Sequence, residues 1–114
     1  MDTLDLVLLY DYYGDLLTDR QKECFEMRYY QDLSLGEIGQ ELGISRQGVH
    51  DNLSRAEALL QNMEAKTGCV GRDRACRKAA KTILDAAKAL EAITDPSISA
   101  PVSKIVAAAR SLEE

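Results

Sequence analysis

The sequence feature that most constrains the fold is a pair of helix-start signals separated by a glycine turn. Ser34-Leu35-Gly36-Glu37 is a capping box, in which the serine hydroxyl and the glutamate side chain satisfy free backbone N–H groups at a helix start. Gly43 can adopt the positive φ that ends a helix, and Ser45 belongs to the residue types that cap the next one. A short helix, a tight turn with glycine and a second capped helix define the helix-turn-helix form, which we predict over residues 34–55.

Similar signals continue along the chain, and strand signals are nearly absent. Thr18 and Gln21 form a second capping box, and the stretch 67–71 interrupts the helical pattern. We predict six helices, over residues 4–13, 18–30, 34–42, about 46–66 and about 72–93, with a last one that opens at Pro101 after a loop over 95–100. The predicted fold class is therefore all-α.

Apolar spacing indicates which helix faces are buried. The first helix is apolar almost all round, so we expect it to lie centrally or to pack against a second copy of the chain. The third helix has one apolar stripe, formed by Leu35, Ile38 and Leu42. The fourth helix has a longer one, formed by Val49, Leu53, Ala56, Leu60 and Met63. On the fifth helix we expect one apolar face with Ala79, Ile83, Ala87 and Leu90, and the side opposite the cations, with Ala75, Ala79, Ala86 and Ile83, is expected to be buried.

The size of the chain allows one compact domain or a small core with a helical appendage. Its 114 residues are 46% hydrophobic and 29% charged. We assign residues 1–67 to a helical bundle that contains the helix-turn-helix. Residues 68–114 form an alanine-rich helical hairpin with little large apolar area of its own.

Charge is unevenly distributed along the sequence. The net charge of −5 argues against a protein that coats DNA. Residues 1–17 carry four aspartates and no cation, whereas residues 66–81 carry six cations and one acid. No run of 18 apolar residues is present, and the early charges are acidic rather than positive as in a secretion signal. We therefore expect a cytoplasmic protein without a membrane span.

The predicted second helix of the motif has a mixed outward face. When Val49 and Leu53 face the core, the outward positions are Arg46, Gln47, His50, Asp51 and Ser54. Arginine can grip guanine and glutamine can grip adenine, each through two hydrogen bonds. Asp51 acts against DNA binding, because a carboxylate repels phosphates and can accept a hydrogen bond only from cytosine among the base amines it would meet.

Three interpretations of this face remain open. Arg46, Gln47 and His50 contact a nucleic acid, or these side chains are solvated, or Asp51 and Asn52 complement a basic protein partner. Arg55 either contacts a phosphate or forms an ion pair with Asp51, four residues before it. Such a surface pair stabilises a helix by about 0.3–0.5 kcal/mol.

A second candidate surface lies in the basic segment. If the segment is helical, one face carries Arg74, Arg77, Lys78 and Lys81, at i, i+3, i+4 and i+7. This face is either solvated or contacts RNA phosphates. No aromatic residues are interleaved with the cations, which argues against sequence-specific binding of single strands.

The sequence offers no pattern for catalysis or for a cofactor. It has no glycine-rich phosphate loop and no nucleophile beside a histidine. One histidine and three cysteines fit no metal-binding spacing, so we expect reduced thiols and no metal. The five tyrosines are expected in the core and in a dimer interface rather than in a cofactor site.

The order of the motifs resembles two related groups of proteins. Residues 18–60 are similar to region four of the sigma-70 class, which reads promoter DNA. The fuller match, over residues 4–67, is to the YlxM family of small bacterial proteins. The blocks that carry it are the tyrosine-rich opening 8–18, Tyr29-Tyr30, residues 32–38, residues 45–52 and Arg55.

The resemblance implies a helical, homodimeric, cytoplasmic protein that is encoded beside the signal recognition particle GTPase or its receptor. It further implies a regulatory role in protein targeting, with the GTPase or the RNA of that particle as partner. The alternative is a sequence-specific DNA-binding transcriptional regulator that uses Arg46, Gln47 and His50. The tail after residue 68 departs from the shorter, acidic tails of the family, so no role for it is carried over.

Overall fold

The computed structural model describes residues 2–113 and confirms the all-α fold class. Six α-helices are present: α1 (Thr3–Tyr13), α2 (Asp19–Tyr29), α3 (Leu35–Leu42), α4 (Arg46–Thr67), α5 (Cys69–Lys88) and α6 (Pro96–Ser111). A single 3₁₀ turn, η1 (Gly14–Leu16), follows α1. Residues 2–113 contain no strand. The chain forms two compact units, an N-terminal unit of Met1–Val70 and a C-terminal unit of Gly71–Glu114.

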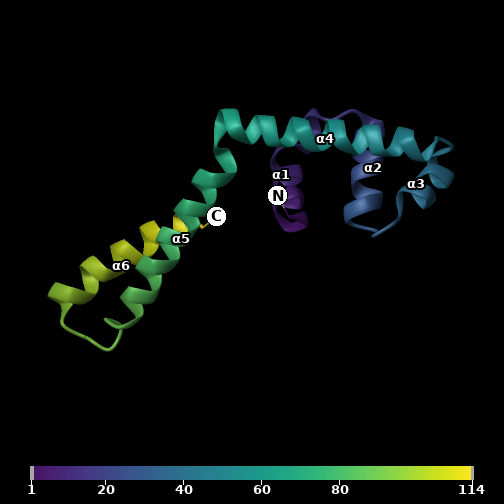
Figure 1. Cartoon of the computed structure of the whole chain (residues 1–114). Coiled ribbons are helices and arrows are strands. Elements are labelled where there is room, and N and C mark those ends of the chain that lie inside the picture. Colours follow the sequence, from purple (N-terminus) through teal and green to yellow (C-terminus); the bar gives the residue numbers. More distant parts are fainter. Residues whose placement is uncertain (1, 114) are drawn as a thin grey trace. The chain divides into compact units, whose positions relative to one another are not determined.

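In the N-terminal unit, α4 is the element on which the other helices pack. Helices α1, α2 and α3 all contact it, and Figure 1 shows them along one side of the long α4 rod. Its predicted apolar stripe is confirmed, because Val49, Ala56 and Leu60 are fully buried and Leu53 is nearly so. One cluster joins this stripe to α1 and Phe25, and a second joins it to Cys24 and Ile38.

An aromatic cluster ties α1 to α2. Phe25 is completely buried, and its ring stacks on Tyr10 with a centroid distance of 4.3 Å. Tyr29 lies against the same phenylalanine at 4.6 Å. Aromatic pairs at these distances stabilise beyond their buried area, so Phe25 is the centre of the contact between the first two helices.

The helix ends follow the predicted capping signals. Both capping boxes form, with Thr18 paired to Gln21 and Ser34 paired to Glu37. Ser45 caps α4 by accepting a hydrogen bond from the Gly48 N–H at 2.9 Å. At the start of α1, Asp2 accepts the Asp5 N–H at 2.9 Å, so local side chains cap all four helices from α1 to α4.

Helix α1 does not lie centrally within the chain, and the alternative, that it packs against a second copy, stays a prediction. Leu6, Leu9 and Tyr13 are buried against the core, but Leu4 is 73% exposed and Tyr12 is 42% exposed. Leu4 and Tyr12 therefore lie largely outside the core that Leu6, Leu9 and Tyr13 join.

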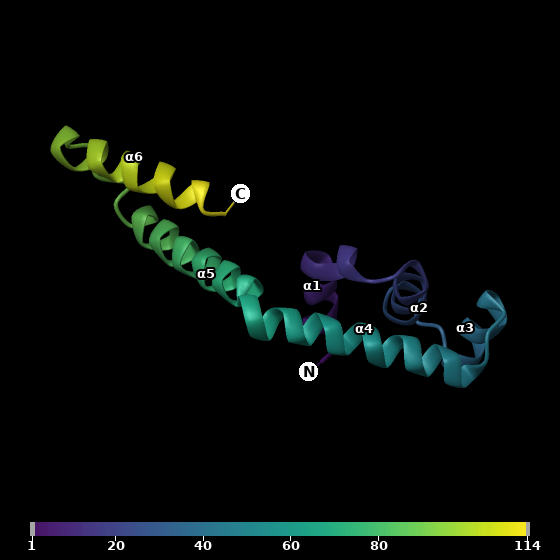
Figure 2. The same ribbon diagram turned by 90° about the horizontal axis from the view of Figure 1, so that it is seen from above.

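The C-terminal unit is a hairpin of α5 and α6, which lie side by side in both views (Figures 1 and 2). The predicted bounds of α5, about 72–93, were shifted. Gly68 ends α4 with φ of 63°, and α5 begins at the next residue. The side chain of Glu64 accepts a hydrogen bond from the Val70 N–H, and that of Thr67 accepts one from the Cys69 N–H. Because these bonds satisfy the first N–H groups of α5, the connection between α4 and α5 can be a single residue. Beyond Lys88 the backbone hydrogen bonds join residues three apart in the sequence, as in a turn, instead of four apart as in an α-helix.

The predicted start of the last helix at Pro101 was also wrong. Asp95 caps α6 by accepting the Ser97 N–H at 3.0 Å, and Pro96 occupies the first turn, where its missing N–H is not needed. Pro101 therefore lies inside the helix, where it removes one backbone hydrogen bond. Residues 96–100, assigned to a loop from their composition, are helical.

The buried side of α5 agrees with the predicted one only at Ala87. Ala80 and Ala87 are the buried residues of α5 in this unit, and Ala109 is the buried residue of α6. Ala75, Ala79 and Ala86 are exposed, and Ile83 is 38% exposed. The two helices meet through alanines, which leaves the larger apolar residues at the edge of the contact.

We predict that Phe25→Ala lowers the free energy of unfolding by about 3–5 kcal/mol, because it empties a fully buried aromatic site. Denaturant titration followed by circular dichroism measures this. Tyr30→Phe is the matched control, because Tyr30 is 50% exposed, and should stay within about 0.5 kcal/mol of the parent. Equal effects of the two changes would contradict the assignment of Phe25 to the centre of the core.

Candidate functional site

The helix-turn-helix is held by a close backbone contact inside its turn. Gly43 takes the left-handed conformation with φ of 69°, as predicted, and Ile44 N–H donates to the carbonyl of Gly39 at 3.0 Å. A Cβ atom on Gly39 would lie 2.7 Å from the carbonyl oxygen of Ile44. This position therefore requires glycine, and the resulting contact fixes how α4 leaves the turn.

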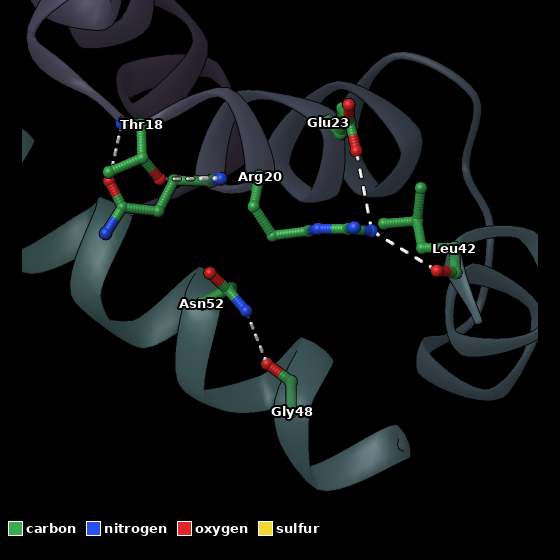
Figure 3. A network of polar contacts seen from close by, with 7 residues as sticks. Thr18, Arg20, Glu23, Leu42, Gly48 and Asn52 are labelled. Atoms are coloured by element: carbon green, nitrogen blue, oxygen red, sulfur yellow. Dashed lines mark hydrogen bonds and ion pairs between the residues drawn. The ribbon is translucent and has the colours of Figure 1, made fainter. Parts of the chain in front are cut away.

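Arg20 braces the same turn from α2, as Figure 3 shows. Its Nη1 donates to the carbonyl oxygen of Leu42 at 3.3 Å and lies 3.6 Å from Oε2 of Glu23. The last carbonyls of a helix have no partner within the helix, so a cation here satisfies one of them and also interacts favourably with the helix dipole. The sequence did not indicate this role, because 22 residues separate Arg20 from Leu42 and no local spacing links them.

The outward face of α4 has the composition that the sequence predicted. Val49 is fully buried and Leu53 nearly so, and the five predicted outward residues are exposed: Arg46, Gln47, His50, Asp51 and Ser54. The first turn of α4 begins beside the helix-turn-helix corner, so Arg46 and Gln47 lie where a recognition helix presents its base-contacting residues.

Asp51 organises the middle of this face. Gln47 Nε2 donates to Asp51 Oδ1 at 3.0 Å, and His50 Nδ1 lies 3.7 Å from the same oxygen. The side chains of His50 and Asp51 are 58% and 55% exposed, so solvent or a partner can reach both. The expected pair of Asp51 with Arg55 is absent among residues 2–113. The carboxylate instead accepts a hydrogen bond from Gln47 and lies near His50, both on its N-terminal side.

Asn52 does not add a free amide to this face. Its Nδ2 donates to the carbonyl oxygen of Gly48 at 2.9 Å (Figure 3), a side-chain bond back to the preceding turn of α4. Asn52 is half-buried, so the surface offered to a partner consists of Arg46, the Gln47–Asp51 pair and His50.

These contacts limit what the face can bind. To grip adenine, Gln47 must point one amide N–H and its carbonyl at the base, but the orientation of this amide is set by its hydrogen bond to Asp51. A phosphate near the middle of this face is repelled by the Asp51 carboxylate. A basic or amide-rich protein surface meets no such barrier, because it can bond to the second oxygen of Asp51.

The basic segment forms a face of α5 in the C-terminal unit, and one of its cations has a structural role. Arg77 Nε lies 3.0 Å from Oδ2 of Asp73, and Arg77 Nη1 donates to the carbonyl oxygen of Glu113 at 2.7 Å. This arginine joins α5 to the end of α6. Arg74, Lys78 and Lys81 are exposed on the same helix. The nine predicted site residues thus form two separate surfaces, one on α4 and one on α5.

Two tyrosine hydroxyls of the N-terminal unit bond to acids of α4. Tyr13 donates to Glu64 at 2.7 Å, and Tyr29 donates to Glu57. Burial, together with the neighbouring Glu57 carboxylate, raises the pKa of Tyr29 to about 12. These phenols therefore stay neutral donors over the ordinary pH range. They anchor α1 and α2 to α4.

Residues 2–113 lack the features of a metal site, a disulfide or a membrane-spanning helix. No three His, Cys, Asp or Glu side chains gather there as metal ligands would. None of the three cysteines forms a disulfide. No helix in the described part of the chain has the length and apolar character to cross a bilayer.

We predict that Gly39→Ala lowers the free energy of unfolding by about 1–3 kcal/mol, because the new Cβ meets a backbone carbonyl that cannot move without distorting the turn. Gly36→Ala is the matched control in the same helix. The nearest heavy atom to a Cβ there is 4.0 Å away, so this change should be neutral or stabilise by up to about 1 kcal/mol. Thermal and denaturant unfolding of both variants measure the difference, and effects of the same sign would refute the tight turn.

Comparison with known proteins agrees with this geometry. The profile of the UPF0122 family, described as "Putative helix-turn-helix protein, YlxM / p13 like", matches residues 1–96. The UPF0122 protein of Thermoanaerobacter sp. (strain X514) is 59% identical over 71 residues, which cover 62% of this chain and 61% of the relative. The relative from Desulforamulus reducens is 54% identical over 65 residues, which cover 57% of this chain and 56% of its own length.

A third relative, the UPF0122 protein of Halalkalibacterium halodurans, is 45% identical over 64 residues, which cover 56% of this chain and 59% of the relative. The chain therefore spans about three fifths of the length of the curated relatives it matches. Helix α6 begins at the last residue of the family match and lies almost wholly beyond it. With most of the chain matched, and with the predicted helix-turn-helix formed over α3 and α4, the protein belongs to the YlxM/p13-like helix-turn-helix family.

Proposed function

We propose that this protein is a non-catalytic, homodimeric regulator of the signal recognition particle pathway that acts in the cytoplasm. In this proposal the α4 face binds the GTPase of the particle, and the basic face of α5 contacts its RNA. The helix-turn-helix, similar to sigma region four, then serves as a protein-binding element. The proposal goes beyond family membership, which establishes the helix-turn-helix alone.

The observation that carries the proposal is the position of Asp51 at the centre of the α4 face. It accepts from Gln47 and lies within 3.7 Å of His50, so two of the three candidate base-reading side chains are directed toward a carboxylate. A charge at 4 Å in water contributes about 1 kcal/mol, which is repulsive toward a phosphate and attractive toward a lysine or arginine. The same arrangement therefore disfavours duplex DNA and favours a basic protein surface.

The exposed cations of α5 support an additional RNA contact. Lys78 and Lys81 are exposed one turn apart, beside Arg74 on the same helix face. Such a face binds phosphates without reading bases, which suits a structured RNA recognised by its backbone.

Dimer formation in the proposal uses the uncovered side of α1. Leu4, Leu8, Tyr12 and Leu16 follow at intervals of four residues, and three of them are 42–73% exposed. Leu9 of the same helix is 3% exposed and belongs to the core. A second copy would cover the α1 stripe, and the acids beside it, such as Asp11, would remain at the rim.

The alternative function is a DNA-binding transcriptional regulator. It is favoured by the exposure of Arg46, Gln47 and His50 on the second helix of a well-formed helix-turn-helix. It requires Gln47 to leave Asp51 on binding. The wild-type chain would then select one sequence from a random duplex pool, and Arg46→Ala would relax the preference at one base.

The direct test of the proposed function uses the purified full chain with three probes: the particle GTPase, the particle RNA and a random-sequence duplex DNA. Fluorescence anisotropy at near-physiological salt should give saturable binding to the GTPase or the RNA. Binding to duplex DNA should stay in the non-specific range, with a dissociation constant weaker than about 1 μM. Saturable, sequence-selective binding to DNA with no binding to either particle component would replace the proposal by the alternative.

We predict that Asp51→Asn strengthens binding to duplex DNA by about fivefold at low salt, because one repulsive charge is removed and Gln47 is released. The same variant should bind the GTPase more weakly. Asp32→Asn is the matched control, because it removes one charge from an exposed residue of the α2–α3 loop whose positive φ an asparagine tolerates. If both variants change DNA binding equally, only net charge matters and the role of Asp51 is excluded.

For the α5 face, we predict that Lys78→Gln/Lys81→Gln weakens RNA binding and reduces the slope of log affinity against log salt by about 1.5, or about 0.7–0.9 for each lost phosphate contact. Lys104→Gln removes an exposed cation from α6 and should leave the slope almost unchanged. An unchanged slope in the double variant would show that this face is merely solvated.

A further inference from the structure

The two helices of the C-terminal unit share a sequence pattern that the hairpin alone does not use. On α5 and the turn after it, the apolar positions run 76, 80, 83, 87 and 90, and on α6 they run 98, 102, 105, 109 and 112. Both series follow spacings of four and three residues. This is the heptad pattern of helices that pack side by side in coiled coils and four-helix bundles.

Only the small members of each series are buried. Ala80, Ala87 and Ala109 are 0–6% exposed and hold the helices together. The large members are 37–51% exposed, namely Ile83, Leu90, Ile98, Ile105 and Leu112. In a complete bundle such residues fill the centre. Here they remain at the surface of a two-helix unit.

These exposed residues border an apolar groove between α5 and α6. The groove has a volume of about 230 Å³ and is lined without a polar side chain by Ile83, Ala86, Ala87, Leu90, Val102 and Ile105. Exposed alanines at positions 79, 86 and 108 adjoin it, so another helix can approach closely. The other edge of the hairpin is different, because Lys81, Asp85 and Glu91 line the cavity there.

The rim of the groove identifies its occupant. The positions that flank the heptad series on this side are Ala75, Thr82 and Ala89 on α5, and Ser97, Lys104 and Ser111 on α6. Only one of these six residues is charged. A basic or acidic peptide finds no complementary charge on such a rim, whereas two copies of the same face meet without repulsion.

The energetics also favour a second hairpin. A unit of about 44 residues whose buried residues are alanines has too small a core to be stable by itself. Two such hairpins would convert two exposed heptad faces into the interior of a four-helix bundle, and a two-fold axis makes one face sufficient for both partners.

We propose that the α5–α6 hairpin pairs with the same hairpin of a second copy across this groove, forming a four-helix bundle. The contact is distinct from the α1 stripe and from the basic face of α5. It does not depend on the proposed targeting function, because α6 lies almost wholly beyond the family match.

The test uses the full chain and light scattering after size exclusion over a series of concentrations. In a Leu4→Glu/Tyr12→Glu background, which removes the α1 contact, the protein should still be a dimer. Adding Ile83→Lys/Ile105→Lys should halve the mass, and helix content by circular dichroism should be retained because both isoleucines are already partly exposed. Adding Ala100→Lys/Ala107→Lys instead, at two exposed alanines of α6 outside the groove, should leave the dimer intact.

A monomer at every concentration in the Leu4→Glu/Tyr12→Glu background would overturn the proposal. So would a dimer that survives the two lysines in the groove. If the lysine variant loses its helices, hydrogen exchange in the Leu4→Glu/Tyr12→Glu background decides the question. Amides of α5 and α6 should become more protected as concentration rises, and protection independent of concentration would show that no second copy covers the groove.

Discussion

The N-terminal unit depends on the burial of one stripe of α4 against three preceding helices. Val49, Ala56 and Leu60 are inaccessible to solvent, and each neighbouring helix adds a part of the cover. Because α4 is the common packing partner, its rotation about its own axis is fixed by the core. The residues on its other side therefore leave the helix in fixed directions, so their positions relative to one another are defined before a partner binds.

Because α4 is held in this orientation, the Asp51 carboxylate lies on the face that a partner would contact. The helix-turn-helix turn, held by Gly39 and Gly43 and braced by Arg20, presents the first turns of α4 as it would for DNA. The arrangement at Gln47 and His50 then opposes this use, because both are directed toward an acid. Shape and charge thus point in different directions, and in our proposal charge decides the class of partner because phosphate contacts supply much of the affinity for DNA.

The features that could be predicted from the sequence are those set by local chemistry. The two capping boxes, the positive φ of Gly43 and the stripe of α4 each depend on residues within a few turns, and all were confirmed. The residues that face outward on α4 could be predicted from the same periodicity. Family membership followed from ordered motifs and was confirmed by the match over residues 1–96.

The features that sequence reasoning missed depend on competition between neighbouring signals or on distant contacts. Two prolines offered two starts for α6, and the aspartate before Pro96 decided between them. Gln47 and Arg55 each lie four residues from Asp51, and on an exposed helix a rotamer toward either one is open. The spacing therefore could not show that Asp51 accepts its hydrogen bond from Gln47. The Arg20 brace and the bond from Arg77 to Glu113 join residues far apart in the chain, which no local spacing reveals.

The claim that Asp51 directs the α4 face away from duplex DNA is tested most directly by nuclear magnetic resonance of the full chain. The side-chain amide of Gln47 and the backbone amides of residues 46–54 would be followed while duplex DNA, and then the particle GTPase, is added at physiological salt. We expect these signals to stay unchanged with DNA and to shift saturably with the GTPase. Saturable shifts of the same signals with DNA, together with release of the Gln47 amide from Asp51, would contradict the account.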